Sequence, residues 1–133
     1  MSFKLSQRSK ANLEGVDDRL VKVINRALEI SSADFAVIEG KRTMKQQEEN
    51  VRKGVSKTMA SRHLTGHAVD ILPSAIKPGM NWDLKYFEPV LDAIARAGEE
   101  LGVPLRFGIN WKIDPSLPIE TKFIDAPHVE IPR

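Results

Sequence analysis

The chain has 133 residues, of which 41% are hydrophobic and none is cysteine. This length and composition fit a single compact domain over residues 1–133, and the lack of cysteine excludes disulfide bonds, thiol nucleophiles and cysteine-bound zinc. The net charge of +2 gives only a weak preference for anionic partners, and because no basic run is interleaved with aromatic residues, we do not expect binding to nucleic acid.

The first residues carry no apolar segment of the kind that directs secretion, and no stretch of about 18 apolar residues could span a bilayer. We therefore expect a protein made in the cytoplasm, with no signal peptide and no stable insertion into a membrane. Transfer to another compartment would require a second protein.

The first half of the chain predicts three elements. Residues 16 to 30 place apolar side chains at three- and four-residue steps, which is typical of an amphipathic helix. Residues 34 to 39 are a short, β-prone run closed by Gly40, and they predict a strand. Thr43 is a candidate cap for a polar helix that runs to Gly54.

The middle of the chain predicts a loop, a strand and a second long helix. Residues 56 to 65 show no periodicity and are expected to form a loop, whereas the apolar run from 67 to 72 predicts a strand. Asp83 is a candidate cap for a helix over residues 84 to 101, which Gly102 would end.

The last part predicts two short strands, over residues 105 to 107 and 128 to 131, separated by a loop from 108 to 127. A loop of that length without secondary structure is usually functional. Taken together, the elements predict an α+β fold: a small antiparallel sheet with two main helices on one side, in a single domain.

Two places carry residues suited to chemistry, and the first contains His63 and Asp70 on either side of a glycine. In a strand, Asp70 would point away from the face that Val69 and Ile71 share, so its carboxylate would lie at the border of the core and need a partner. A metal cation would be one such partner. Taken alone, the two residues would first be interpreted without a metal, His63 as a solvated loop residue and Asp70 as a turn or cap residue.

The second place contains His128, with Asp125 three residues before it and Glu130 two residues after it. Catalytic zinc sites commonly use three His, Asp or Glu ligands and leave a fourth position to water. His63, Asp70 and His128 form such a set and predict a Zn²⁺ site. For the base that accepts a proton from the water, Asp125 is the better candidate, since Glu130 shares the face of His128 and is placed to orient it.

These residues also form recognisable motifs. The pattern Ser-x-His-x-x-Gly-x-Ala-x-Asp runs from Ser61 to Asp70, and an acid-x-x-His pattern runs from Asp125 to His128. Together they resemble the zinc peptidases that include bacterial D-Ala-D-Ala dipeptidases and carboxypeptidases and the phage L-alanyl-D-glutamate endopeptidases. The resemblance implies that His63, Asp70 and His128 bind zinc and that Asp125 is the general base. An aspartate in that place, rather than a glutamate, is similar to the phage enzymes.

The same resemblance extends to Gly40, Arg42 and Gln46, whose spacing is similar to a pattern in the phage enzymes. It implies that Arg42 binds substrate and stabilises the developing oxyanion, a task suited to a guanidinium, and that Gln46 assists Arg42 in the substrate site. Without the family, Arg42 would be read equally well as a surface residue at the start of a helix. The implied fold is D-Ala-D-Ala carboxypeptidase-like.

The resemblance implies that the chain hydrolyses the L-alanyl-D-glutamate bond of peptidoglycan stem peptides as a phage endolysin. The expected protein is a monomer that waits in the host cytoplasm and needs a holin to reach the periplasm and cell wall. Two alternatives stay open: a D-Ala-D-Ala carboxypeptidase or dipeptidase, and a noncatalytic wall-binding or structural zinc module. His67 has helix-type spacing from His63, but Gly66 between them argues against a ligand role. Trp82 and Trp111 have no assigned role.

Overall fold

The computed structural model describes residues 3–54, 62–121 and 124–132. Its strands form one antiparallel sheet in the order β1-β2-β4-β3, which confirms the α+β class with a small antiparallel sheet. In chain order the elements are α1 (Gln7–Asn12), α2 (Asp18–Ile30), β1 (Phe35–Glu39), α3 (Met44–Arg52), the 3₁₀ helix η1 (Arg62–Thr65), β2 (Ala68–Pro73), the 3₁₀ helix η2 (Leu84–Tyr86), α4 (Phe87–Leu101), β3 (Arg106–Phe107) and β4 (His128–Glu130).

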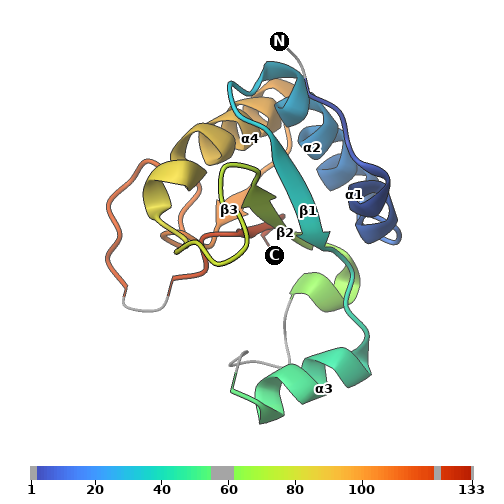
Figure 1. Ribbon diagram of the computed structural model, residues 1–133. Helices are drawn as coiled ribbons and strands as arrows, with labels where there is room; N and C mark the ends of the chain where they lie inside the picture. The colour runs from blue at the N-terminus through green and yellow to red at the C-terminus, as the bar shows by residue number, and fades with distance from the viewer. Residues whose placement is uncertain (1–2, 55–61, 122–123, 133) are drawn as a thin grey trace.

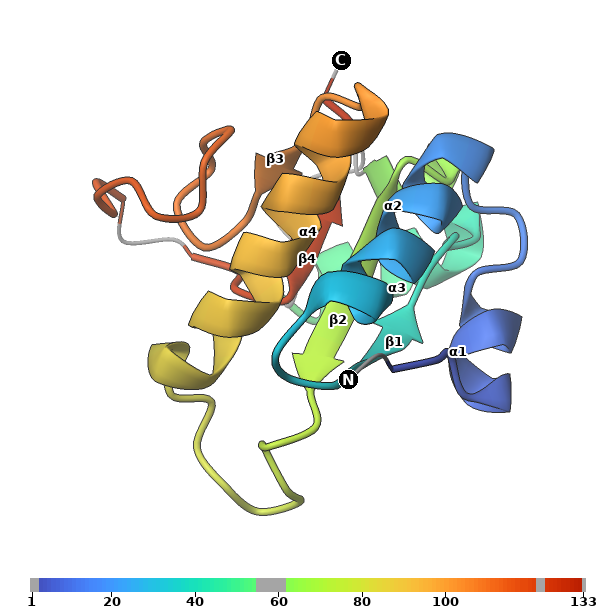
Figure 2. The same ribbon diagram turned by 90° about the horizontal axis from the view of Figure 1, so that it is seen from above.

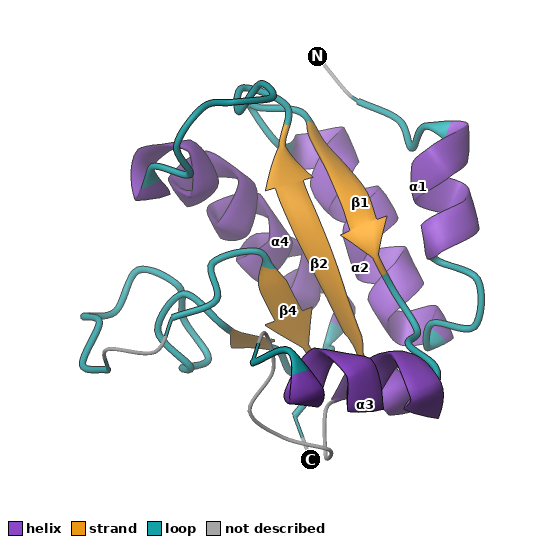
Figure 3. Ribbon diagram, turned by 60° about the horizontal axis from the view of Figure 1, so that its bottom comes forward, coloured by secondary structure: helices purple, strands orange, loops and turns teal. Residues whose placement is uncertain are grey.

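The sheet has one face covered by helices. α2 and α4 pack against each other and lie side by side over that face, while α1 runs beside β1 at the edge of the sheet (Figures 1 and 2). α3 lies apart from this pair, across one end of the strands (Figure 3). The prediction of two main helices on one side of the sheet is therefore confirmed.

The core forms between the sheet and these two helices. Alternate strand residues point into it, including Val69 and Ile71 of β2 and Val129 of β4, all fully buried. Facing them are apolar side chains spaced along α2 and α4, among them Leu20, Val23, Ile24, Ala27, Phe87, Val90, Leu91 and Ile94. The opposite strand residues, such as Asp70, must then point to the other face of the sheet, where charged groups can gather.

The helix ends are capped by the predicted residues Thr43, Asp83 and Gly102 and by Asp17, which was not predicted. Asp17 caps α2 with a hydrogen bond from the Arg19 amide, which explains why the helix begins two residues later than predicted. Thr43 caps α3, and Gly102 ends α4 in the left-handed conformation that glycine adopts without strain. The predicted helix over 84–101 divides into η2, which Asp83 caps, and α4.

Two elements differ from the sequence-based expectation. α1 was not predicted, because six residues are too few to show a helical period. The end of the expected loop over 56–65 forms η1, which carries His63, while residues 55–61 of that loop, with Ser61, lie outside the described residues. Within the described part of the chain, no helix combines the length and apolar character needed to cross a membrane.

Candidate metal centre

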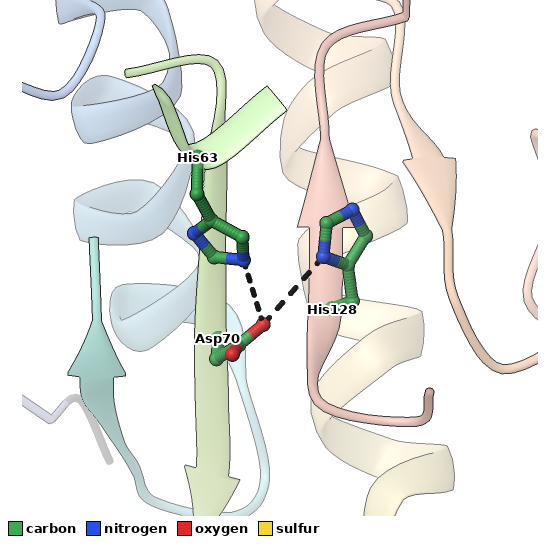
Figure 4. Close-up of side chains that lie close together, drawn as sticks. All are labelled: His63, Asp70 and His128. Atoms are coloured by element: carbon green, nitrogen blue, oxygen red, sulfur yellow. Dashed lines mark hydrogen bonds and ion pairs between the residues drawn. The ribbon is translucent and has the colours of Figure 1, made fainter. Parts of the chain in front are cut away.

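Three side chains converge on the face of the sheet that α2 and α4 leave uncovered. His63 comes from η1, Asp70 from β2 and His128 from the neighbouring strand β4, where it lies directly opposite Asp70. One potential ligand atom of each residue lies within 4.8 Å of those of the other two. Figure 4 shows that both imidazoles point at the same carboxylate oxygen of Asp70, at 3.2 Å from His63 Nε2 and 3.6 Å from His128 Nδ1.

The orientation of His63 is fixed from behind. Its Nδ1 lies 2.8 Å from the carbonyl oxygen of Gly40, and because a carbonyl only accepts hydrogen bonds, Nδ1 must carry the proton. Gly40 itself has no room for a side chain, since a Cβ there would meet the Asn12 carbonyl oxygen at 1.9 Å. The Gly40 carbonyl, in a closely packed segment, therefore determines that Nε2 of His63 faces Asp70.

His128 is held in the same manner by a different acceptor. Its Nε2 lies 2.8 Å from a carboxylate oxygen of Glu130, so Nε2 carries the proton and Nδ1 faces Asp70. Burial of Glu130 would by itself raise its pKa, but the hydrogen bond from His128 and the nearby positive charges keep that pKa below its usual value. Each histidine thus donates one ring hydrogen to an outer oxygen, the arrangement typical of metal-binding histidines.

This hydrogen bonding tests whether the residues fit a metal. With one ring nitrogen of each histidine already donating, the remaining nitrogens of His63 and His128 would present lone pairs to an Asp70 oxygen that also has only lone pairs. That contact is repulsive unless a proton or a cation lies between them. Two imidazole nitrogens and one carboxylate oxygen form a ligand set that zinc uses in catalytic sites. The three residues therefore fit Zn²⁺.

The charges of the metal-free site point to the same need for a cation. Burial by itself would raise the pKa of Asp70, but hydrogen bonds from His128 and His63 outweigh it and hold that pKa well below its usual value. Burial opposes the charged form of His128, yet its bonds to Asp70 and Glu130 raise its pKa to about 9. Without a metal, the site keeps a proton where a metal would bind.

Asp125 lies at the rim of this group. One carboxylate oxygen is 3.9 Å from His128 Nδ1, and its side chain is 42% exposed, so it can reach both the centre and solvent. Burial and the neighbouring charge of Asp70 raise the pKa of Asp125. A carboxylate with a raised pKa next to a metal site is suited to accept a proton from water.

The backbone fixes where Asp125 stands. The His128 amide donates to the Asp125 carbonyl at 3.0 Å, and Gly108 donates to His128 and accepts from Asp125, both at 2.8 Å. A Cβ at Gly108 would lie 2.2 Å from the Asp125 carbonyl oxygen. The tight turn from 125 to 128 therefore depends on a glycine in the segment beside it.

Arg42 lies just before α3 and is buried. Its Nε donates to Glu39 at 2.7 Å, its guanidinium also donates to the buried Gln47, and its backbone amide donates to the His63 carbonyl. The bond to the His63 carbonyl places Arg42 beside the metal centre, and its positive charge opposes the rise in the pKa of Asp125. The motif resemblance predicted that Arg42 belongs to the site, but it did not indicate that Glu39 and Gln47 orient its guanidinium.

Gln46 occupies a different position from the one expected for a partner of Arg42. Its side-chain oxygen accepts from the Thr43 amide at 2.8 Å, which completes the capping box of α3. Gln47, one residue later, faces inward and contacts Arg42. The pattern from Gly40 to Gln46 contains no signal for this difference, since only the rotation of the helix decides which glutamine is buried.

The structure also shows where three residues without a predicted role lie. The Trp111 ring lies 5.2 Å from the His128 ring, measured between centroids, so this tryptophan borders the centre. Trp82 instead packs near Phe87. His67 is not part of the cluster of potential ligands: its Nδ1 lies 2.6 Å from the Thr65 hydroxyl and its Nε2 lies 3.6 Å from Asp17. Aromatic residues near a metal site have no characteristic spacing, so Trp111 could not be distinguished from Trp82.

Two histidines, one carboxylate and an adjacent acid on a small α+β scaffold define a metal-binding site of the class that hydrolases use to activate water. Comparison with known proteins then gives the family. A model described as phage L-alanyl-D-glutamate peptidase matches residues 1–131, and the chain belongs to this family.

Individual relatives agree with the family. The chain is 39% identical over 137 aligned positions to the L-alanyl-D-glutamate peptidase of Escherichia phage T5, covering 98% of this chain and 99% of that protein. It is also similar to the crystal structure of the Serratia marcescens L-Ala D-Glu endopeptidase ChiX, with a TM-score of 0.80 and 38% identity over 98% of this chain and 91% of that one. The resemblance stated from the motifs is therefore confirmed over nearly the whole chain.

Proposed function

We propose that this chain is a zinc-dependent endopeptidase that hydrolyses the L-alanyl-D-glutamate bond in peptidoglycan stem peptides. The observation that carries the proposal is the convergence of His63 and His128 on one oxygen of Asp70, with Asp125 beside them. Membership of the phage peptidase family and the names of the relatives support the choice of bond. They favour this activity over a D-Ala-D-Ala carboxypeptidase or dipeptidase.

Each residue has a defined task in this reaction. His63, Asp70 and His128 would hold the zinc, which when bound supplies a Lewis acid that lowers the pKa of water and polarises a peptide carbonyl. Asp125 accepts a proton from the attacking water and returns it to the departing amine. Arg42 stabilises the negative charge that develops on the carbonyl oxygen.

The exposure of Asp125 argues for catalysis over a purely structural metal. A structural zinc site is closed by four protein ligands, whereas the described residues around this centre supply a cluster of three. Asp125 stands next to them with 42% of its side chain exposed, which leaves it accessible to substrate and water. Three protein ligands leave a fourth coordination position for water, and Asp125 lies beside it as the base.

We further propose the biological setting that goes with this activity. The enzyme would act as a monomer on the bacterial wall, wait in the host cytoplasm, and enter the periplasm through a membrane hole that a holin makes. The resulting loss of stem-peptide links would weaken the wall and lyse the cell. Peptidoglycan as the substrate is consistent with the named relatives.

The test compares wild type with Asp125→Asn on purified Gram-negative peptidoglycan. We expect wild type to release D-glutamate amino ends that chelation abolishes, and Asp125→Asn to retain zinc but lose about 100- to 10,000-fold in turnover, the usual contribution of a general base. Products are identified by mass and zinc by elemental analysis. Asp92→Asn, which changes an exposed acid that pairs with Arg96 on the surface of α4, should behave as wild type.

Each contrary outcome has a definite meaning. Release of D-alanine instead of D-glutamate ends would replace this activity with that of a carboxypeptidase. Zinc binding without cleavage by wild type would favour the noncatalytic module. Full turnover by zinc-loaded Asp125→Asn would remove Asp125 from the role of base.

A further inference from the structure

We propose that Trp111 is a positioning residue whose indole holds the His128 imidazole in the orientation that metal binding requires. The inference rests on the proposed function, because it assumes that His128 is a metal ligand. It concerns a residue for which neither the motifs nor the reaction just described has a use. The contacts around Trp111 carry it in three steps.

The backbone of Trp111 is strained, and its neighbours hold it in place. With φ of 59°, Trp111 is the non-glycine residue in the left-handed region among those that the structure describes. This conformation costs about 1–2 kcal/mol for an ordinary residue and persists only where the surroundings enforce it. Here the Trp111 amide donates to the Phe107 carbonyl at 2.6 Å, and the Phe107 amide donates to the Lys112 carbonyl at 2.9 Å.

A buried amide side chain stabilises the same turn from the other side. Asn110 is 3% exposed, and its side-chain nitrogen donates to the carbonyls of Asp114 and Leu117, at 2.8 and 3.1 Å. Its side-chain oxygen accepts from the Lys112 amide at 2.9 Å. Asn110 therefore ties the loop that follows β3 to the residues on either side of Trp111, and the position of the indole is set by a closed hydrogen-bond network.

The indole of Trp111 contacts both Arg106 and the metal ligand His128. The guanidinium carbon of Arg106 is 5.1 Å from the centre of the indole, and Arg106 Nε donates to the Trp111 carbonyl at 3.0 Å. The His128 ring lies 5.2 Å from the indole with the two planes 46° apart. Arg106 thus holds both the side chain and the backbone of the residue that contacts His128.

The His128 ring depends on such contacts to keep its orientation. Besides Trp111, it meets the His63 ring edge-on at 5.1 Å and donates to Glu130. Removing the indole would open one side of the imidazole and allow rotation about its side-chain bonds. Since a ligand nitrogen must point closely at the metal, that rotation would weaken binding even though no ligand is lost.

A competing role for the indole would be to stack on the substrate. That role predicts a higher KM with unchanged metal affinity, because the substrate would lose a contact while His128 keeps its orientation. A purely structural role predicts a lower melting temperature of the metal-free protein, with neither the zinc affinity nor kcat changed. The three roles therefore separate when zinc affinity, kcat, KM and stability are measured on the same variants.

The experiment uses Trp111→Ala, Trp111→Leu and Trp111→Phe, with Trp82→Ala as the matched control. Trp82 is 52% exposed and contacts Phe87, so its loss leaves the centre untouched. Zinc affinity is measured by competition with a chromophoric chelator in the absence of substrate. kcat and KM are measured on purified peptidoglycan fragments at saturating zinc, and melting is followed with the metal removed.

We expect Trp111→Ala to bind zinc about 10- to 100-fold more weakly, the range typical of residues that orient metal ligands, with a lower kcat and little change in KM. Trp111→Phe, which keeps an aromatic ring, should recover most of the affinity, and Trp111→Leu, which keeps only bulk, should recover less. Trp82→Ala should match wild type. Should Trp111→Ala not fold, the order of Phe above Leu still tests the inference.

Wild-type zinc affinity and kcat in all three Trp111 variants would overturn the proposal, and a rise in KM alone would assign the indole to substrate. Failure of the proposed function looks different: wild type would bind zinc yet cleave no L-alanyl-D-glutamate bond. Because zinc affinity is measured without substrate, the ranking of the Trp111 variants remains decisive in that case.

Discussion

A change at Glu130 should affect metal binding without removing a ligand or the base. Glu130 contacts Nε2 of the His128 ring, whereas Asp70 lies near Nδ1. We expect Glu130→Gln to keep an acceptor for the His128 Nε2 hydrogen but lose its charge, and so to weaken zinc binding about 10-fold or more. Excess zinc should restore turnover. The measurement is activity as a function of free zinc, set with a metal buffer.

Glu100→Gln is the appropriate control, because Glu100 pairs with Arg26 on the exposed surface of α2 and α4. Its zinc dependence should equal that of wild type, and its stability should change by at most about 1 kcal/mol. A Glu130→Gln protein whose activity follows the wild-type zinc curve would show that the charge of Glu130 has no part in holding His128.

The segments on either side of the metal centre depend on Gly108, which brings the end of β3 against the turn before β4. In Gly108→Ala the new Cβ would approach the Asp125 carbonyl oxygen and the His128 Cβ, at 2.2 and 2.8 Å, so the turn must move. We expect a loss of about 1–3 kcal/mol in the free energy of unfolding, as in other overpacked sites, and a fall in turnover of roughly 100-fold from the misplaced base.

Gly79→Ala is the matched control, because it makes the same substitution at a glycine where a Cβ has room. Gly79 has φ of 86° but no atom within 4 Å of a Cβ built there, so alanine would meet conformational strain without a clash. It should lose about 1–2 kcal/mol of stability and keep wild-type turnover. Denaturant unfolding gives the stabilities, and equal turnover by both alanine variants would contradict the role of Gly108 in placing Asp125.

Sequence reasoning predicted the elements that have a strong local signal. The apolar period of α2 and the cap at Thr43 gave those helices within a few residues, and the alternation around Asp70 placed that carboxylate on the face away from the core. The short α1 and η1 have no such period. Their positions depend on contacts with distant parts of the chain, such as the bond from the Asn12 side chain to the Val37 carbonyl.

For the candidate site, sequence reasoning predicted the ligands but not all of the groups that orient them. His63, Asp70 and His128 could be chosen because few side chains bind zinc and their motifs are specific. The acceptors that orient the two rings could be only partly anticipated. Glu130 followed from the two-residue period of a strand, whereas the Gly40 carbonyl is a backbone group that no residue pattern marks.

At the scale of the whole molecule, the metal centre should make stability depend on pH and on zinc together. The pKa of His128 in the folded, metal-free chain is raised to about 9 from 6.5, so this protonated group stabilises the fold fully below about pH 6.5 and loses that contribution as pH rises through 9. The lowered pKa of Asp70 affects stability at acidic pH. The ionised Asp70 carboxylate stabilises the fold, and this stabilisation is lost only as the pH falls below the usual pKa of an aspartate.

We therefore expect the melting temperature of the chelator-treated protein to fall between pH 6.5 and 9.5, and zinc to remove most of that fall by taking the place of the proton. At a free zinc concentration of about 100 times Kd, linkage gives roughly 2.7 kcal/mol of added stability. Calorimetry over this pH range with and without zinc is the measurement. A metal-free protein equally stable at both pH values would contradict the proton-holding site.

The order of the strands has a consequence for when the protein becomes active. β4 is the last strand along the chain, yet it lies inside the sheet between β2 and β3, and it brings the third ligand, His128. A ribosome that has made everything through α4 has delivered His63 and Asp70, but β3 and the interior strand β4 are still missing from the sheet. A nascent chain therefore lacks a complete ligand set until β4 has been made and has entered the sheet beside β2.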